Sequence, residues 1–401
     1  MQEKRRWTVR DLRRDNRSVL LWSLFSCQPC SRQDLSEATG LSTASVSNVI
    51  RELISEGIVT EAGSVDSDGG RPRILLRMNP GCGYVAGVDV GETRVRVELF
   101  DLTMSVRAKA EYALDPREHG VEVVVDRIAA GLASVLADSG ADPSAVLGAG
   151  VGVPGVVEQG AEALVYGQTY GWDAVPLARL LRPAVGFPLY IDNGARTMAQ
   201  AELWFGAGRD TRQAVVCLMG SGLGASIITG SPGRGGSSTA VEWGHTTIEV
   251  GGRLCRCGAR GCLEAYVGAE AILDRYGLTA PGDDEESAFA ALTAASTERA
   301  AEVLDETALY LGAGIANLIN LFGPERIILG GWAGLLLGAR ILPEIRAAAR
   351  RHALDHRFIQ ASIEIGRLGP DAVALGAATL PMEHFLNGTL PVRTSASRAV
   401  G

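Results

Sequence analysis

The sequence of 401 residues lacks long apolar segments and contains few cysteines. No segment approaches the roughly 18 consecutive apolar residues of a membrane-spanning helix, so no transmembrane helix is expected. The charged N-terminal residues 1–7 do not lead into an apolar segment, which argues against a secretory signal peptide. The seven cysteines, an odd number, fit a reducing cytoplasm better than a disulfide framework. Cys27 and Cys30 have no partner pair nearby, so we interpret them as small apolar residues at the end of a helix.

Charge is unevenly distributed along the chain, which has a net charge of −8. Residues 1–80 contain 12 Lys and Arg against 10 Asp and Glu, so this segment carries +2 and the remainder −10. A basic N-terminal module would be attracted to nucleic acid while an acidic body would be repelled, which would orient the molecule as it approaches DNA. The chain is long enough for two or three domains.

Four side chains that commonly bind zinc occur within residues 242–264. His245, Cys255, Cys257 and Cys262 are spaced as His-x9-Cys-x-Cys-x4-Cys. Three thiolates and one imidazole suit a closed tetrahedral Zn²⁺ site, and a site without an open coordination position is structural rather than catalytic. The alternative is three unpaired cysteines and a hydrogen-bonded histidine, but three of seven cysteines within eight residues disfavours it. The segment therefore predicts a structural zinc centre.

Three short helices are predicted near the N-terminus. The first begins near Asn16, and the second covers Ser31–Thr39, with Ser31 as its N-cap and Asp34 completing an acidic capping box. A glycine turn follows, and a third helix begins at Ser42. Short polar side chains at the start of such a helix can approach base edges and phosphates in the major groove. The side chains predicted to contact DNA from this helix are Ser42, Thr43, Ser45, Ser47, Asn48 and Arg51.

A two-stranded wing is predicted after the third helix, from Ile58–Thr60 and Ile74–Leu76. The connecting loop carries Arg71 and Arg73 next to glycines, and an arginine there can enter a narrow, A·T-rich minor groove. The alternative is a protein–protein module whose polar face is only solvated, but a helix-Gly-Leu-Ser-helix pattern followed by a basic wing disfavours it. Residues 1–80 are therefore predicted to form a winged helix-turn-helix domain that binds double-stranded DNA.

The zinc segment resembles the zinc motif of the ROK family, which comprises repressors, open reading frames of unknown role and sugar kinases. The resemblance covers about residues 10 to 385. It implies an α/β fold in which the winged helix-turn-helix of ROK repressors precedes two actin-like domains of the ribonuclease H-like ATPase fold, as in sugar kinases. We expect the first actin-like domain at 81–188, completed by a helix near 370–385, the second at 189–369, and a disordered tail at 387–401.

The resemblance also implies a nucleotide site, but one position argues against its use. The family motif Asp-x-Gly-Gly-Thr of the first hairpin turn has Glu92 here in place of the second glycine. A carboxylate in a loop that approaches a triphosphate adds like-charge repulsion and bulk, which disfavours tight ATP binding. The positions that correspond to the nucleotide-binding loops, interpreted as vestigial, are Asp89, Gly91, Thr93, Gly220, Gly222, Gly330 and Gly331.

The resemblance places a substitution at the catalytic base. ROK kinases carry Glu-Asn-Asp-Ala where this chain has Asp-Asn-Gly-Ala at 192–195, and their Asp takes the proton from the sugar hydroxyl. Gly194 replaces that Asp, and Asp192 lies on the wrong side of Asn193. General-base catalysis contributes roughly 10²–10⁴-fold, so its loss usually leaves a binding protein. A glycine at 194 is compatible with a pentose such as xylose, which lacks the hydroxymethyl group, although a bulkier substituent would also fit.

Sugar binding survives this substitution in our interpretation, because polar residues that match the family's sugar-contacting positions are retained. One ring nitrogen of His245 would bind zinc while the other donates to a sugar hydroxyl. Glu264 has an alternative role as the cap of a helix beginning near Leu263, and Trp172 is interpreted either as a cleft residue or as a core residue. The predicted sugar-binding residues are Asn193, Glu242, His245 and Glu264.

We therefore predict a cytoplasmic, zinc-stabilised repressor of carbohydrate genes. It would bind operator DNA, and so lie on the nucleoid when bound. Its effector would be a monosaccharide, either a pentose or a hexose. A pseudo-palindromic operator requires at least a dimer, so a homodimer or homotetramer is expected. Sugar binding would shift the population of inter-domain arrangements, with the zinc loop as a candidate relay. The alternatives are a bifunctional regulator with residual ATP-dependent sugar kinase activity and a DNA-bound scaffold with a vestigial cleft.

Overall fold

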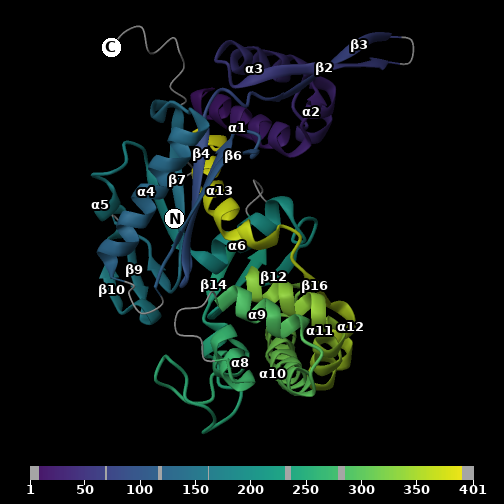
Figure 1. The fold of residues 1–401 in the computed structure, drawn as a ribbon. Coiled ribbons are helices and arrows are strands. Elements are labelled where there is room, and N and C mark those ends of the chain that lie inside the picture. The colour runs from purple at the N-terminus through teal and green to yellow at the C-terminus, as the bar shows by residue number, and fades with distance from the viewer. Residues whose placement is uncertain are drawn as a thin grey trace, which may run out of the picture.

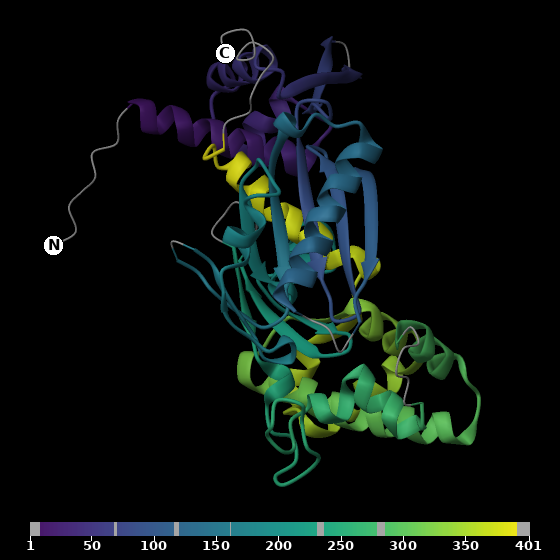
Figure 2. The same ribbon diagram turned by 60° about the vertical axis from the view of Figure 1, so that its left-hand side comes forward.

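The computed structural model describes residues 9–67, 70–115, 120–160, 162–230, 236–278 and 285–390. An N-terminal winged helix-turn-helix module is followed by two α/β lobes, each built on a five-stranded mixed sheet. Figures 1 and 2 show the module at one end of the molecule, next to the first lobe, with the second lobe at the opposite end. The predicted fold class is confirmed.

The N-terminal module forms where the sequence places a capping box and a helical apolar stripe. Ser31 Oγ accepts a hydrogen bond from Asp34 N at 3.3 Å, and Asp34 Oδ2 accepts one from Ser31 N at 2.8 Å, so the predicted capping box is confirmed. Gly40 ends the second helix in the left-handed region, at φ 70°, and Ser42 caps the third helix. The module contains α1 (Val9–Cys27), β1 (Cys30–Ser31), α2 (Arg32–Thr39), α3 (Thr43–Ser55), β2 (Val59–Ser67) and β3 (Gly70–Met78), with strand order β1-β3-β2.

Helix α1 begins at Val9, although the apolar spacing indicated a start near Asn16. Its additional turns carry Arg13, whose guanidinium group pairs with Glu52 of α3. This contact joins two helices that are distant in sequence, so the local pattern of α1 does not reveal it. The wing strands β2 and β3 likewise extend beyond the predicted segments.

The interpretation of Cys27 and Cys30 as unpaired apolar residues is wrong, because the structure joins them by a disulfide. Helix α1 ends at Cys27 and strand β1 begins at Cys30, so only two residues separate them. This short turn places the two Cα atoms 5.9 Å apart, within the range that a disulfide bridges. The sequence correctly placed the two cysteines at the end of a helix, but it did not show that the turn brings them within bonding distance of each other.

The first lobe is a sheet in the order β11-β7-β4-β5-β6 with helices on both faces. Side chains alternate along β4 and β5: Val88 and Val97 pack with α4 on one face, whereas Val85 and Phe100 pack with α13 on the other. The lobe contains β4 (Tyr84–Val90), β5 (Arg94–Asp101), β6 (Val106–Ala113), α4 (Val121–Ser139), β7 (Val146–Val153), β8 (Val156–Glu158), β9 (Leu164–Gly167), β10 (Trp172–Val175), α5 (Leu177–Leu181), β11 (Leu189–Asn193) and α13 (Ala372–Leu386).

Helix α13 approaches the first sheet so closely that two strand positions have no room for a side chain. A Cβ atom on Gly87 would lie 1.9 Å from the Ala374 carbonyl oxygen, and one on Gly150 would lie 1.8 Å from the Ala377 carbonyl oxygen. Glycine is required at both positions because another backbone lies against the strand. The helix is thereby fixed along the sheet from the strand ends toward the DNA-binding module (Figure 2).

The second lobe repeats this plan with a sheet in the order β14-β13-β12-β15-β16. Val215 and Ile327 pack with α10 and α11 on one face, whereas Val216 and Ile328 pack with α6 on the other. Because α6 also packs on α13, it lies between the lobes. The elements are α6 (Gly194–Phe205), β12 (Gln213–Met219), β13 (Leu223–Thr229), β14 (Ser237–Val241), α7 (Glu264–Val267), α8 (Ala269–Tyr276), α9 (Glu285–Ala294), α10 (Glu298–Phe322), β15 (Arg326–Gly330), α11 (Gly331–His352), α12 (Asp355–Gln360) and β16 (Ser362–Ile365).

Strand β11 pairs in parallel with β7 and therefore belongs to the first sheet, although the sequence predicted that the second domain begins at 189. The apolar pattern of a strand does not indicate which of two similar sheets it joins. Helix α13 ends at Leu386, and most of the tail predicted to be disordered, from 391 onward, lies outside the described residues. Among the helices that the structure describes, none is both long and apolar enough to cross a membrane.

Candidate functional site

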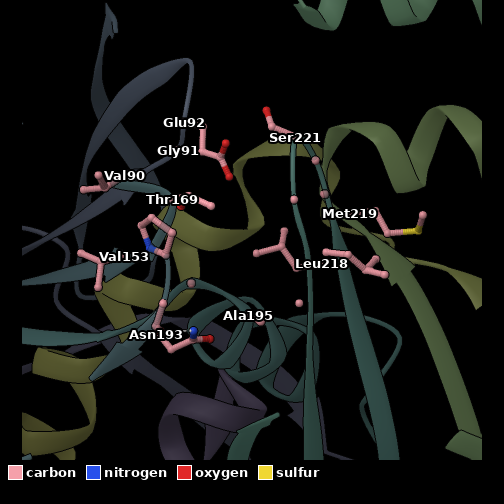
Figure 3. Close-up of a pocket in the computed structure, with 18 of the residues that line it drawn as sticks. Val90, Gly91, Glu92, Val153, Thr169, Asn193, Ala195, Leu218, Met219 and Ser221 are labelled. Atoms are coloured by element: carbon pink, nitrogen blue, oxygen red, sulfur yellow. Dashed lines mark hydrogen bonds between the residues drawn. The ribbon is translucent and has the colours of Figure 1, made fainter. Parts of the chain in front are cut away.

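A cleft of about 550 Å³ opens between the two lobes, at the ends of the central strands. The first lobe contributes the turn after β4 and the end of β7, and the second contributes the β12–β13 turn and the zinc segment. In Figure 3, Glu92 and Ser221 face each other across the cleft, and Asn193 and Ala195 lie on the side formed by α6. The carboxyl ends of parallel strands meet here, which is where open α/β sheets bind ligands.

The four predicted sugar-binding residues all line this cleft, although they lie on separate elements. Asn193 caps α6, since its Oδ1 accepts from Arg196 N at 3.1 Å and its Nδ2 donates to Gly155 O at 2.7 Å. Glu264 is buried, and its Oε2 accepts a hydrogen bond from Leu223 N at 2.8 Å. Glu242 is exposed and His245 half-buried. The arrangement presents an amide, two carboxylates and an imidazole to one cavity.

The four predicted zinc ligands lie together, with one ligand atom from each residue within 4.8 Å of the others. Cys257 Sγ lies 3.7 Å from Cys262 Sγ, and Cys255 Sγ lies 3.7 Å from His245 Nδ1. Tetrahedral coordination with Zn–S bonds of about 2.3 Å places sulfur atoms about 3.8 Å apart, so the observed spacing fits Zn²⁺. Such an ion would cross-link residues that are otherwise joined by isolated β-bridges.

Gly194 is the first residue of α6 and occupies an apolar corner of the cleft. A Cβ atom there would lie 3.6 Å from the Val153 carbonyl oxygen, 3.7 Å from Leu218 Cδ2 and 3.8 Å from Val373 Cγ1. Asp192 is buried outside the cleft lining, where its carboxylate pairs with Arg196 at 2.9 Å. Burial raises the pKa of Asp192, and Arg196 opposes that shift. The Asp192 carboxylate is therefore held by Arg196 rather than presented to the cleft.

The positions predicted as vestigial nucleotide loops line the end of the cleft at the β4–β5 and β12–β13 turns, where Gly222 also lies against Glu264, with one exception. Gly330 is absent from the lining, because its Cα faces Met198 of α6, whose sulfur atom would lie 3.0 Å from an added Cβ. Desolvation raises the pKa of Asp89 to about 6, partly offset by Arg96. The indole of Trp332, which the sequence did not single out, also lines this end, 3.0 Å from a Cβ atom built on Gly220. The lining positions are Asp89, Gly91, Thr93, Gly220, Gly222 and Gly331.

Trp172 belongs to the core of the first lobe rather than to the cleft lining. It is 6% exposed and packs edge-on against Tyr170, with ring centroids 5.1 Å apart. The Tyr170 hydroxyl donates to Gly91 O at 2.7 Å, so this aromatic pair supports the turn after β4 from behind.

Sequence reasoning missed three arginines of the cleft, Arg94, Arg96 and Arg256. Arg256 pairs with Glu92 at 2.6 Å, and Arg94 pairs with Glu286 at 3.1 Å. Each of these pairs joins the first lobe to the second. Because the partners lie about 160 or more residues apart in the chain, no local spacing could have revealed them.

The predicted DNA-reading residues form the start of α3 and the base of the wing. Ser42, Thr43, Asn48 and Arg51 are exposed, whereas Ser45 and Ser47 are half-buried. Asn48 Oδ1 accepts a hydrogen bond from Arg51 Nη1 at 3.1 Å, which aligns the two side chains on one face of the helix.

On the wing, Arg73 is exposed and its Nη1 lies 3.9 Å from Asp34 Oδ1 of α2. The side chain of Arg71 lies outside the part of the chain that the structure describes, as does the tip at residues 68–69. Strand β3 of the wing therefore contacts α2, the helix that precedes the recognition helix.

Aromatic side chains join the DNA-binding module to the helices that leave the cleft. Trp204, near the end of α6, packs edge-on against Trp22 of α1 with ring centroids 4.9 Å apart, and against Phe25 at 5.6 Å. Trp22 Nε1 donates to Asn387 Oδ1, just beyond α13, at 2.8 Å. Helices α6 and α13 thus both begin at the cleft and end on the module (Figure 1).

Comparison with known proteins identifies relatives over most of the chain. A model of the ROK family matches residues 85–384, and a model of winged helix-turn-helix DNA-binding domains matches residues 14–60. The xylose repressor of Caldicellulosiruptor bescii is 30% identical over 395 residues, which cover 94% of this chain and 97% of the repressor.

Solved structures include both a relative that covers the whole chain and a relative that lacks the DNA-binding module. A ROK family transcriptional regulator, described as a homolog of the Escherichia coli MLC protein, superposes with a TM-score of 0.75 at 25% identity over 94% of this chain and 98% of its own. A ROK glucokinase of Streptomyces griseus, in complex with glucose and AMPPNP, has a TM-score of 0.63 at 29% identity and covers 74% of this chain and 99% of its own. The regulators span the module and both lobes, whereas the kinase spans the lobes alone.

Proposed function

The chain belongs to the ROK family, and we propose that it is a sugar-responsive repressor that binds operator DNA through its winged helix-turn-helix. The observation that carries this proposal is the physical connection of a DNA-binding module to a polar cleft by two helices that contact both. The xylose repressor that resembles this chain has the same extent, including the module. Two modules are needed to present two recognition helices to a pseudo-palindromic operator, so we propose at least a homodimer.

A monosaccharide effector fits the polar residues of the cleft, and a pentose fits its apolar corner. The space beside Gly194 is bounded by the aliphatic side chains of Leu218 and Val373 and by the Val153 carbonyl oxygen, and none of the three can donate a hydrogen bond to a hydroxymethyl oxygen. A hydroxyl buried there that does not reach the Val153 carbonyl would lose about 1–3 kcal/mol. We therefore propose xylose or a similar pentose as the effector, in agreement with the resemblance of this chain to the xylose repressor of Caldicellulosiruptor bescii.

Substitutions at Gly194 test the proposal that the effector is a pentose and the proposal that position 194 has lost the catalytic base. Gly194→Asp places a carboxylate between Leu218 and Val373, and we expect it to lower the affinity for D-xylose about tenfold or more by desolvation and crowding. Gly194→Ala is the matched control, because its Cβ meets only ordinary contacts at 3.6 Å or more and should leave the affinity unchanged. Calorimetry with D-xylose and D-glucose measures both variants.

An ADP-release assay of the unmodified protein tests for residual sugar kinase activity. We expect no ADP release above background from the unmodified protein with D-xylose or D-glucose, because position 194 offers no proton acceptor and Glu92 lies in the loop that would face a triphosphate. Sustained ADP release would instead support the bifunctional regulator.

The DNA-binding face is tested by Arg51→Ala. This exposed arginine on α3 is expected to contact DNA, and its loss should weaken operator binding by about 1–3 kcal/mol and reduce the salt dependence. Arg212→Ala is the matched control, since this arginine is 94% exposed and lies outside the module. Equal operator affinities of both variants and the unmodified protein, measured by fluorescence anisotropy, would remove α3 from the proposed interface.

Helix α6 is the proposed relay between effector and operator, in place of the zinc loop expected from the sequence. The helix begins at Asn193 and Gly194 in the cleft and ends with Trp204 against the module. The zinc segment lies on the opposite side of the cleft from the module (Figure 1). An effector that binds one lobe arrangement more tightly would therefore shift the position of α6, and with it that of the module.

A further inference from the structure

Three charged side chains from different parts of the chain form a continuous bridge across the cleft. Glu92 lies in the turn between β4 and β5, Arg256 lies in the zinc segment, and Glu264 begins α7. Arg256 donates from Nη1 to Glu92 Oε2 at 2.6 Å and from Nη2 to Glu92 Oε1 at 2.8 Å. Its Nε donates to Glu264 Oε1 at 2.9 Å. We name Glu92, Arg256 and Glu264 the cleft bridge.

The cleft bridge is largely shielded from water. The side chain of Glu92 is 17% exposed, that of Arg256 25% and that of Glu264 7%. Burial by itself lowers the pKa of Arg256, but the Glu92 and Glu264 carboxylates raise it above its usual value. A bidentate arginine–carboxylate pair is stronger and more restrictive in geometry than a single exposed ion pair. The bridge therefore favours one separation of the two lobes.

The zinc segment determines where the Arg256 side chain points. Arg256 lies between Cys255 and Cys257, which are proposed zinc ligands, in a tight turn where Cys255 N donates to Ala259 O at 2.8 Å. A Cβ atom on Gly222 would lie 2.4 Å from Arg256 Nη2, so the guanidinium group lies directly against the β12–β13 turn. The backbone on both sides of Arg256 is thus held by the metal site.

A second ionic contact joins the lobes at the same end of the cleft. Glu286 of α9 lies 3.1 Å from Arg94 Nη2 and 3.3 Å from Arg96 Nη2 of β5, and both arginines also pair with Glu111. Among the described residues that line the cleft, each arginine is therefore engaged by two carboxylates. This pairing leaves the cleft suited to a neutral sugar rather than to a phosphorylated ligand, because a phosphate would have to displace a carboxylate.

We propose that Arg256 is a positioning residue of the effector site, which orients the Glu264 carboxylate toward the sugar and, through Glu92, holds the cleft closed around it. This inference rests on the proposed function of the cleft as a sugar site. With Arg256 on Oε1 and the Leu223 N–H on Oε2, both oxygens of Glu264 are fixed in direction. Oε1 also lies 3.9 Å from Cys255 Sγ, whereas Oε2 retains a second lone pair that can accept from a sugar hydroxyl. Glu92 supplies the anchor on the opposite lobe.

Hydrogen exchange of the zinc-loaded, full-length protein without sugar tests the bridge directly. Glu92→Gln removes a charge with little change of shape, and Arg256→Gln removes the cation. We expect both to raise amide exchange in residues 90–94 and 253–264 about tenfold, because the lobes separate more often. Arg260→Gln is the control, since this arginine of the same segment donates to the backbone oxygen of Gly252 and pairs with no carboxylate among the described residues. Unchanged exchange in both bridge variants, with zinc content retained, would overturn the proposal.

Calorimetry with D-xylose tests whether the bridge serves the effector. Each single variant is expected to bind D-xylose about tenfold more weakly, and the double variant no more weakly than Arg256→Gln, because the two residues act as a pair. Additive losses would show that Glu92 and Arg256 act independently and would overturn the bridge as a unit. If the unmodified protein does not bind D-xylose, the proposed pentose effector is wrong, and the exchange experiment still decides the bridge.

Discussion

Replacing Cys257 by serine is expected to remove the metal and to lower the free energy of unfolding by more than about 4 kcal/mol, as the loss of a structural metal does. The four ligand atoms lie within 4.8 Å of one another on a segment whose described residues form few regular elements. A structural zinc ion contributes its binding free energy to folding, so a three-ligand site holds both the ion and the fold less well. Because Arg256 and Glu264 lie in or beside this segment, the response to sugar should be lost as well.

The metal content and thermal unfolding of the purified variant measure this effect. Cys82→Ser is the matched control, because Cys82 is a free cysteine outside the cluster and its replacement should change neither zinc content nor stability much. A Cys257→Ser protein that retains a full equivalent of zinc would remove this cysteine from the ligand set.

Replacing Trp204 by alanine is expected to cost about 3–5 kcal/mol of stability and to uncouple DNA binding from the sugar. Trp204 is 8% exposed and is the side chain through which α6 contacts both Trp22 and Phe25 of the module. Without it the module keeps only the packing of Phe25 on Phe205, with ring centroids 6.1 Å apart, among the described aromatic contacts with α6. The sugar should still bind, while its effect on operator affinity falls toward zero.

Leu311→Ala provides the matched control for the loss of a large buried side chain. Leu311 is 0% exposed and lies on α10 in the core of the second lobe, at the opposite end of the molecule from the module (Figure 1). The control should lose comparable stability and retain the dependence of operator binding on sugar. If Trp204→Ala still releases DNA at the same sugar concentration as the unmodified protein, α6 is not the relay.

Features that depend on nearby residues were accessible from the sequence. The capping box of Ser31 and Asp34 lies within four residues, and the buried stripe of α3 follows the helical period. The spacing of the three cysteines after His245 likewise identifies residues whose side-chain ligand atoms the fold brings within 4.8 Å of one another, because short glycine-containing turns connect them. Local chemistry determines each of these features.

Features that depend on contacts between distant residues could not be predicted from the sequence. The pairing of Glu92 with Arg256 and the packing of Trp22 on Trp204 join segments whose relative placement depends on the whole fold. Membership of β11 in the first sheet has the same cause, since two similar sheets offer the same apolar surface to a strand. The sequence therefore predicted the residues of the cleft better than the ionic contacts that close it.

The central claim is that a sugar in the cleft controls operator binding by the N-terminal module. Fluorescence anisotropy on DNA from upstream of the protein's own gene, titrated with D-xylose and a panel of other monosaccharides, tests it most directly. We predict tight binding in the absence of sugar and release by a pentose at concentrations that leave the Trp204→Ala variant bound. Tight DNA binding that no monosaccharide alters would contradict the account.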